Sequence, residues 1–181
     1  MTTAWVLRKV EAKGFSKTLG LALLGSLLVA LLAKVQLPFV PVPLTGQTFG
    51  VLLVGGLFGA RLGALSLLLY LIEGALGLPV FAKGGGVAYL LGPTGGYLFA
   101  FPLAAFLAGV MVERGMARRF STAIFAMLLA ALSVFLLGLP WLSLYLGAEL
   151  DRALVLGFYP FVPGEVLKAL LAAWILWRGY R

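Results

Sequence analysis

The sequence predicts an all-α polytopic membrane protein, a six-transmembrane-helix bundle with both termini cytoplasmic. Of its 181 residues, 62% are hydrophobic and 11% are charged, whereas soluble domains carry roughly 25% charged residues. The mean hydropathy is +1.10. The apolar residues form continuous runs instead of alternating with polar ones, a pattern that favours helices over the strands of a transmembrane barrel. A chain this apolar is expected to lie in the membrane almost throughout.

Six apolar segments define the expected helices, and they cover residues 19–33, 47–60, 62–78, 95–112, 122–139 and 163–177. A helix needs about 20 residues to cross a hydrocarbon core, so several of these segments are short and their ends are approximate. Residues 59–61 form a tight turn between the second and third segments. We expect one membrane domain over residues 1–181, with residues 1–18 as a cytoplasmic N-terminal segment and residues 19–181 as the bundle.

The basic residues indicate the orientation of the bundle. The chain has 14 Lys and Arg against 6 Asp and Glu, a formal net charge of +8. With the N-terminus inside, the inner segments hold Arg8, Lys9, Lys13, Lys17, Arg61, Arg114, Arg118, Arg119, Arg178 and Arg181. The outer segments hold only Lys34, Lys83 and Arg152, and Lys168 lies within the last span. This bias follows the positive-inside rule, so the excess of Lys and Arg reflects membrane orientation and not nucleic acid binding.

In the first segment, small residues recur every four positions, at Ala22, Ser26 and Ala30. Small residues at this spacing give a smooth helix face that another helix can approach closely. The spacing alone favours a partner helix in the same chain, and a helix of another subunit is the alternative.

The three outer loops are rich in Pro, Gly and aromatic residues, unlike the short basic inner loops. The first covers residues 37–47, the second covers residues 79–96, and the third includes Trp141, Tyr145 and residues 159–161. Non-helical backbone near membrane depth is tolerated only where protein buries it or where it lines a cavity. We therefore expect these loops to converge on one face of the bundle, as a ligand pocket with its lid.

Two opposite charges, Glu165 and Lys168, stand at the head of the last apolar segment. Charge in hydrocarbon is costly, and an ionisable residue there is a functional hypothesis by default. Pro163 suits the first helical position, the helix dipole favours a carboxylate at Glu165, and a spacing of three places both side chains on one face. The alternative is a helix cap in a structural ion pair, or a lysine that snorkels to the interface.

The second outer loop contains Gly84-Gly85-Gly86 and opens the fourth segment with a second glycine cluster, residues 92–96. Exposed backbone N–H groups at a helix N-terminus can hold a carboxylate, and Lys83 adds positive charge nearby. The alternative is loop turning and tight helix packing. Glu73, near the outer end of the third segment, either faces the pocket or reaches the outer interface.

Several kinds of chemistry are missing from the sequence. The chain has no Cys and no His, which removes thiolate nucleophiles, Cys/His metal sites and His-based acid–base catalysis. The pattern GxxxxGK[ST] is absent, so the chain has no evident means of hydrolysing ATP. We therefore expect neither an enzyme nor a bound cofactor or metal.

Blocks of residues along nearly the whole chain resemble BioY, the biotin-specific substrate-binding (S) component of energy-coupling-factor (ECF) transporters. They are LPF at residues 37–39 with PLTGQT at 43–48, GLPVFA at 77–82, LGPTGGYL at 91–98 and FVPGEVLK at 161–168. The resemblance implies six helices, cytoplasmic termini and a vitamin pocket near the outer face of the cytoplasmic membrane of a prokaryote. It also implies two kinds of partner, a transmembrane coupling subunit and two cytoplasmic ATPase subunits that supply the energy.

The resemblance further assigns roles to individual residues. Biotin is the transported ligand, and Glu165 and Lys168 supply its polar contacts, although Asp is commoner than Glu at position 165 in the family. The expected substrate-binding set is Glu165, Lys168, Lys83, Gly84, Tyr89, Tyr97, Phe39 and Gln47. The family usually docks the coupling subunit through the small-residue face of the first helix, so the resemblance points Ala22, Ser26 and Ala30 toward another subunit.

Three other functions remain open at this stage. The first is an S component for a different vitamin or for a metal, although the missing His and Cys argue against nickel or cobalt. The second is a solitary biotin transporter that works without the ATPase module. The third is a membrane enzyme acting on lipids, which would be expected to show clustered acids, His or a metal motif in the inner loops.

Overall fold

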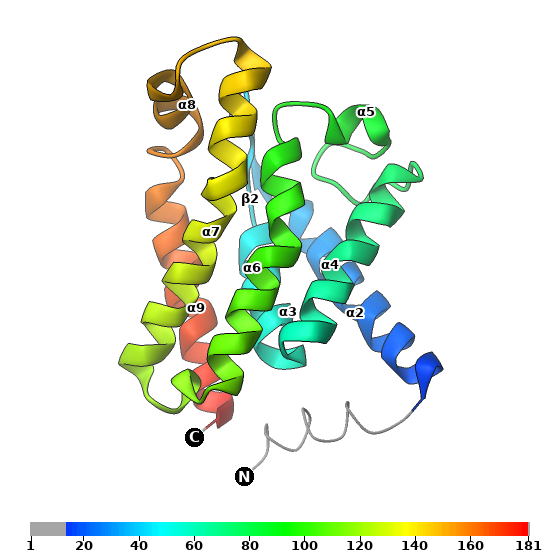
Figure 1. Cartoon of the computed structure of the whole chain (residues 1–181), viewed down its shortest axis with the longest axis vertical. Coiled ribbons are helices and arrows are strands. Elements are labelled where there is room, and N and C mark those ends of the chain that lie inside the picture. The colour runs from blue at the N-terminus through cyan, green and yellow to red at the C-terminus, as the bar shows by residue number, and fades with distance from the viewer. Residues whose placement is uncertain (1–13, 181) are drawn as a thin grey trace.

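The computed structural model describes residues 14–180, and within them six helices of twelve or more residues form a bundle (Figure 1). These helices are α2 (Phe15–Ala33), α3 (Gln47–Phe58), α4 (Ala60–Ala75), α6 (Gly95–Glu113), α7 (Phe120–Leu146) and α9 (Val162–Tyr180). Shorter elements are α5 (Val87–Leu90), η1 (Met116–Arg118) and α8 (Leu150–Gly157). The strands β1 (Gln36–Leu37) and β2 (Leu44–Thr45) pair antiparallel, with Gln36 opposite Thr45. Each expected apolar segment corresponds to one of the long helices.

Length and composition support membrane insertion for part of this bundle. Among the described residues, α2, α6 and α7 are long and apolar enough to cross a membrane, and α8 with α9, bent by 58° between them, would make a fourth span. The helix α3 is apolar but has only 12 residues. The predicted class, an all-α membrane protein, is therefore confirmed, with three to four spans identified by these criteria.

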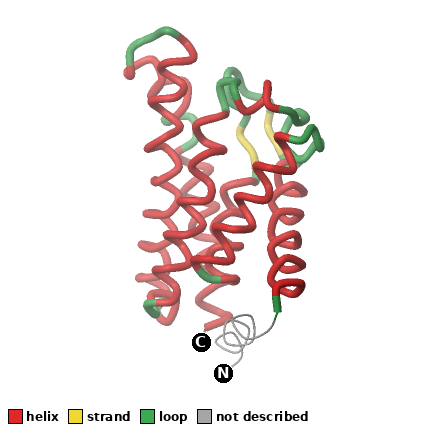
Figure 2. The backbone as a smooth tube through the Cα atoms, turned by 45° about the vertical axis from the view of Figure 1, so that its right-hand side comes forward, coloured by secondary structure: helices red, strands yellow, loops and turns green. Residues whose placement is uncertain are grey.

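The helix α6 runs through the middle of the bundle and packs against α3, α4 and α7, while α2 packs on α4 and α9 on α7. The three Pro- and Gly-rich loops, the β-strands, α5 and α8 gather at the upper end in Figures 1 and 2, and the start of α2 and the end of α9 lie toward the lower end. The predicted convergence of the three Pro- and Gly-rich loops at one end is confirmed. We call these two ends the upper end and the lower end.

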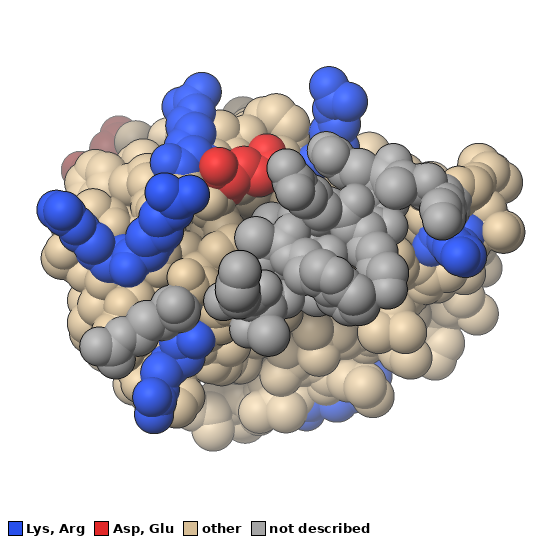
Figure 3. Space-filling model, turned by 90° about the horizontal axis from the view of Figure 1, so that it is seen from below, with Lys and Arg blue, Asp and Glu red and all other residues tan. Residues whose placement is uncertain are grey.

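Lys and Arg side chains gather on the lower end, which Figure 3 shows from below. The described members come from the start of α2, the start of α4, the α6–α7 connection and the end of α9: Lys17, Arg61, Arg114, Arg118, Arg119 and Arg178. Arg8, Lys9, Lys13 and Arg181 lie outside the described residues, as does most of the expected N-terminal segment. Glu113 at this end accepts a hydrogen bond from the backbone N–H of Ala60 at 2.7 Å, which caps α4.

The small-residue face of α2 packs inside the chain. Ala22 and Ser26 are fully buried, and Ala30 is 8% exposed. Ser26 donates a hydrogen bond to Glu73 on α4, and a Cβ on Gly25 would lie 2.6 Å from Ser66 Oγ on the same helix. The intramolecular interpretation of the spacing therefore describes this structure, in which all three residues expected to dock another subunit are buried and Ser26 contacts α4. Glu73, near the end of α4, is half-buried and accepts this hydrogen bond on the side that faces α2.

Two predicted boundaries were wrong. The fifth segment was expected to end at residue 139, but α7 continues through Pro140 to Leu146. A proline inside a helix removes one backbone hydrogen bond, yet α7 continues past it, and Trp141 donates its indole N–H to Gly92 O at 2.9 Å. Trp141 and Tyr145 are thus on a helix and not in a loop. The turn between α3 and α4 is also tighter than expected, because Gly59 alone, with φ of 85°, separates them.

Candidate ligand-binding site

A cavity opens at the upper end of the bundle, with about 510 Å³ of space between protein atoms, part of it open to the solvent. It lies between the first loop with the start of α3, the segment from α5 to α6, the middle of α7 and the head of α9. The lining residues are Val42, Pro43, Thr45, Gln47, Thr48, Tyr89, Thr94, Tyr97, Leu98, Phe101, Val134, Phe135, Phe161, Glu165 and Lys168.

The short helix α3 explains why the bundle has space here. At 1.5 Å per residue, its 12 residues extend only about 18 Å, whereas a hydrocarbon core is about 30 Å thick. The first loop folds into the space above the helix, where Val42 is only 4% exposed. Thr45, Gln47 and Thr48 thus come to the floor of the cavity, at the N-terminal end of α3.

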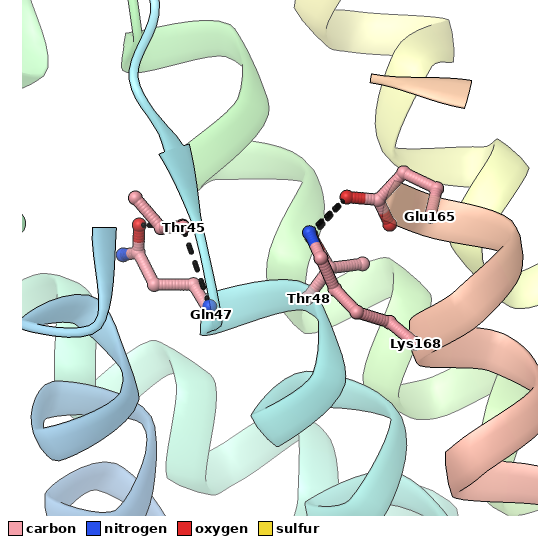
Figure 4. Close-up of polar contacts among 5 residues, drawn as sticks. All are labelled: Thr45, Gln47, Thr48, Glu165 and Lys168. Carbon is pink, nitrogen blue, oxygen red and sulfur yellow. Dashed lines mark hydrogen bonds and ion pairs between the residues drawn. The ribbon is translucent and has the colours of Figure 1, made fainter. Parts of the chain in front are cut away.

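The Glu165–Lys168 pair stands on the first turns of α9, facing Thr48 (Figure 4). Lys168 Nζ lies 2.5 Å from Glu165 Oε1, and the Thr48 hydroxyl donates to the same oxygen at 3.2 Å. Both side chains are largely buried, with 10% of Glu165 and 17% of Lys168 exposed. The predicted helix start is confirmed to within one residue, since α9 begins at Val162 and not at Pro163.

The second carboxylate oxygen of Glu165 has no partner. Oε2 is buried and accepts no hydrogen bond from any described residue. A buried charged oxygen without a donor is energetically costly, unless a ligand supplies the donor. Because Glu165 lines the cavity, the site presents a free acceptor at Oε2 beside the donor Lys168.

Aromatic rings form much of the remaining wall. The Tyr97 ring stacks on that of Phe161 with centroids 6.4 Å apart and meets the Phe135 ring edge-on at 6.0 Å. Its hydroxyl donates to Gly157 O at 3.0 Å, which ties the end of α8 to α6. Such a wall suits a ligand with an apolar body and few polar groups.

Tyr89, on the short helix α5, adds a hydroxyl to the wall. Burial raises the pKa of this hydroxyl above its usual value, and hydrogen bonding to the Lys83 backbone and the Thr94 side chain acts in the opposite direction. The group therefore stays protonated at physiological pH, and it can donate a hydrogen bond to a ligand.

The structure brings together five of the eight predicted ligand residues, since Glu165, Lys168, Gln47, Tyr89 and Tyr97 all line the cavity. The other three do not line it. Phe39 lies behind the wall, edge-on to Phe161 at 6.3 Å. Lys83 is exposed, and Gly84, with φ of 139°, turns a small loop closed by hydrogen bonds with Phe81.

Sequence reasoning missed several neutral residues of the wall, among them two threonines and three apolar residues of α6 and α7. Thr45 and Thr48 were part of a recognised motif, so their hydroxyls at a predicted helix start could have been noticed. Val134, Phe135 and Phe101 gave no signal, because they are apolar residues within continuous apolar segments and the facing side of such a helix is not visible from sequence.

The sequence of this chain is similar to known proteins over most of its length. The model of the BioY family matches residues 3–181. The "Probable biotin transporter BioY" of Pyrococcus horikoshii is 42% identical over 164 residues, covering 90% of this chain and 96% of its own length. The "Biotin transporter BioY" of Rhizobium etli is 36% identical over 162 residues, covering 84% of this chain and 86% of its own.

A solved structure has the same fold. The crystal structure of the S-component for biotin from an ECF-type ABC transporter superposes with a TM-score of 0.79, at 30% sequence identity, over 92% of this chain and 94% of that one. Fold and site together define a small helical membrane protein with a cavity at one end of its bundle, the class of the transporter S components. The chain belongs to the BioY family. The resemblance noted from the sequence is thereby confirmed, and the family is one of transporter components and not of enzymes.

Proposed function

We propose that this chain binds biotin in the cavity at the upper end and serves as the substrate-binding component of an ECF transporter in the cytoplasmic membrane of a prokaryote. The observation that carries the proposal is the buried, unpartnered Oε2 of Glu165 beside Lys168, in a cavity with aromatic walls. The names of its relatives, biotin transporters in Pyrococcus horikoshii and Rhizobium etli, support the same ligand.

The chemistry of biotin suits the groups in this cavity. Its ureido ring offers two N–H donors and one carbonyl acceptor, its valerate chain ends in a carboxylate, and its fused ring body is largely apolar. Glu165 Oε2 would accept from a ureido N–H, and Lys168 would donate to the carbonyl or to the carboxylate. Tyr97, Tyr89 and Phe161 would cover the ring body.

The membrane arrangement follows from the two ends of the bundle. We infer that all six long helices cross the bilayer, with the short α3 and α4 inside the bundle and both termini in the cytoplasm. The lower end carries most of the basic residues, which supports placing it on the cytoplasmic side. The cavity would then open to the outside, where the vitamin is scavenged.

Release to the cytoplasm would need energy from partners. The sequence has no nucleotide-binding motif, so a transmembrane coupling subunit and two ATPase subunits would drive the reorientation of the whole bundle. Docking through Ala22, Ser26 and Ala30 would require α2 to move away from α4, because these side chains are covered here. A chain that transports alone would be recognised by copurification without an ATPase pair and by uptake in cells that lack one.

Thermal stabilisation of the purified protein tests the ligand. Biotin at about 100 times its dissociation constant should stabilise the fold by about 2.7 kcal/mol, which raises Tm by roughly 5–10 °C for a chain of this size. Lys168→Ala should abolish most of the shift. Lys83→Ala, which removes an exposed lysine outside the cavity, is the matched control and should keep it.

Two outcomes would contradict the proposal. The ligand assignment fails if biotin does not stabilise the unaltered protein. The site assignment fails if Lys168→Ala and Lys83→Ala respond to biotin alike.

A further inference from the structure

A strap of residues 76–86 follows α4 and is held by side chains from three elements. Four consecutive carbonyls of this strap accept side-chain hydrogen bonds. Lys34 Nζ donates to Pro79 O at 2.6 Å and to Phe81 O at 2.7 Å, Gln36 Nε2 donates to Ala82 O at 3.1 Å, and the Tyr70 hydroxyl donates to Val80 O at 3.0 Å. Of these donors, Tyr70 is the one whose side chain is also hydrogen-bonded to a side chain that lines the cavity, that of Gln47.

Tyr70 links this strap to the floor of the cavity through Gln47. The Gln47 amide nitrogen donates to the Tyr70 hydroxyl oxygen at 2.6 Å, and this contact is buried. At its other side, the Gln47 amide oxygen accepts from the Thr45 hydroxyl at 2.8 Å, and the Thr45 oxygen accepts from the Gln47 backbone N–H at 3.3 Å (Figure 4). Gln47 and Thr45 line the cavity, whereas Tyr70 does not.

The direction of this chain of hydrogen bonds is fixed by elementary chemistry. A backbone carbonyl can only accept, so the single hydroxyl proton of Tyr70 goes to Val80 O. The Tyr70 oxygen can then only accept, and the group facing it must be the NH₂ of Gln47 and not its carbonyl. The Gln47 amide is thereby held in one of its two flip orientations, and among the described residues its second N–H has no acceptor.

The surroundings of Tyr70 keep it in place. Its side chain is fully buried, and its ring meets the Phe81 ring edge-on at 5.3 Å. The Phe81 ring stacks in turn on Tyr89, a residue of the cavity wall, at 5.1 Å. The ring therefore has little room to turn, and its hydroxyl has a fixed position between the strap and Gln47.

We propose that Tyr70 is a positioning residue for the ligand site, which orients Gln47 so that its free N–H donates to an acceptor oxygen of the ligand. This inference rests on the proposed function, in which the ligand is biotin. Biotin carries such acceptors in its ureido carbonyl and its carboxylate. A flipped Gln47 would present its carbonyl oxygen instead, and two acceptors facing each other repel.

A double-mutant cycle on the full chain, with biotin affinity measured by calorimetry in detergent, tests the proposal. Tyr70→Phe keeps the ring and removes the hydroxyl, and it should weaken biotin binding roughly three- to tenfold, the value of one hydrogen bond. In a Gln47→Leu background the same substitution should have no further effect on affinity. Tyr180→Phe removes a comparable hydroxyl bond, to Gly56 O at 3.2 Å near the lower end, and should leave affinity unchanged.

The outcomes separate this inference from the proposed function. If the unaltered protein does not bind biotin, both fail. If the unaltered protein binds biotin, Tyr70→Phe could still leave the affinity unchanged, or lower it equally in the unaltered and the Gln47→Leu backgrounds. Either result would make Tyr70 only structural and would overturn this inference alone. Should Tyr70→Phe not be recovered folded, Thr45→Val releases the other side of the Gln47 amide, and its effect must likewise vanish in the Gln47→Leu background.

Discussion

At the scale of single residues, the Glu165–Lys168 pair is better explained by a ligand than by stability. Taking two charges out of water costs several kcal/mol, and a well-packed apolar pair is often as stable. The pair also leaves Oε2 of Glu165 buried without a donor, which a purely structural ion pair would avoid. A ligand N–H at this oxygen would complete the hydrogen bonding of the carboxylate.

Replacement of Glu165 tests this reasoning. Glu165→Gln keeps the shape but removes the charge and leaves Lys168 without its partner, so biotin affinity should fall by about tenfold to a hundredfold, as for a charge-assisted hydrogen bond. Glu165→Asp keeps the charge on a side chain one methylene shorter and should retain clearly more affinity than Glu165→Gln. Titration calorimetry measures both. Equal losses in the two variants would show that the charge is not what the ligand uses.

Glu165 and Lys168 were the part of the site that could be predicted from residue type and position alone, whereas Gln47, Tyr89 and Tyr97 were predicted through the family resemblance. Glu165 and Lys168 stand out because charge is rare in an apolar segment, and their spacing places them on one face. Tyr70 and Thr48 do not stand out, because neutral polar residues occur throughout membrane helices. Their importance depends on which helices face each other, and that information is only in the three-dimensional structure.

At the scale of elements, the contact between α2 and α4 depends on small residues. Ser26 is fully buried and bonded to Glu73, and Gly25 leaves no room for a methyl group beside Ser66. The repeat of Ala22, Ser26 and Ala30 predicted a close helix contact, but a repeat is the same whether the facing helix belongs to this chain or to another. Within this chain Ser26 packs on α4, and docking of this face to another subunit, which the resemblance implies, stays a prediction.

Two glycines on α2 allow a matched test of this contact. Gly25→Ala would place its Cβ 2.6 Å from Ser66 Oγ and 3.0 Å from the Phe58 ring, so it should destabilise the isolated protein by about 1–3 kcal/mol through overpacking. Gly20→Ala, with nothing within 4 Å of its Cβ, should be neutral or slightly stabilising. Thermal unfolding in detergent measures both. A Gly25→Ala variant as stable as Gly20→Ala would mean that α2 does not pack on α4 in solution.

At the scale of the whole molecule, the two ends of the bundle differ in charge and in backbone. The lower end has short connections and gathered Lys and Arg side chains (Figure 3). The upper end has longer loops and the two short strands (Figure 2), and the cavity lies there as well. The count of Lys and Arg in each loop predicted this division, because the charge of a loop depends only on the residues of that loop. A pocket under these loops was also expected, but its shape was not predictable, since it depends on where α3 starts and on how the first loop fills the remaining space.

The absence of Cys from the sequence makes the orientation directly testable. Single cysteines can be placed at Val40, which is 78% exposed in the first loop at the upper end, and at Ser121, which is exposed at the start of α7 near the lower end. A membrane-impermeant maleimide added to intact cells should label Val40→Cys and leave Ser121→Cys unlabelled until the membrane is permeabilised. The cysteine-free parent is the background control. Labelling of Ser121→Cys alone in intact cells would reverse the orientation, and the cavity would then face the cytoplasm, where it could not capture biotin from outside.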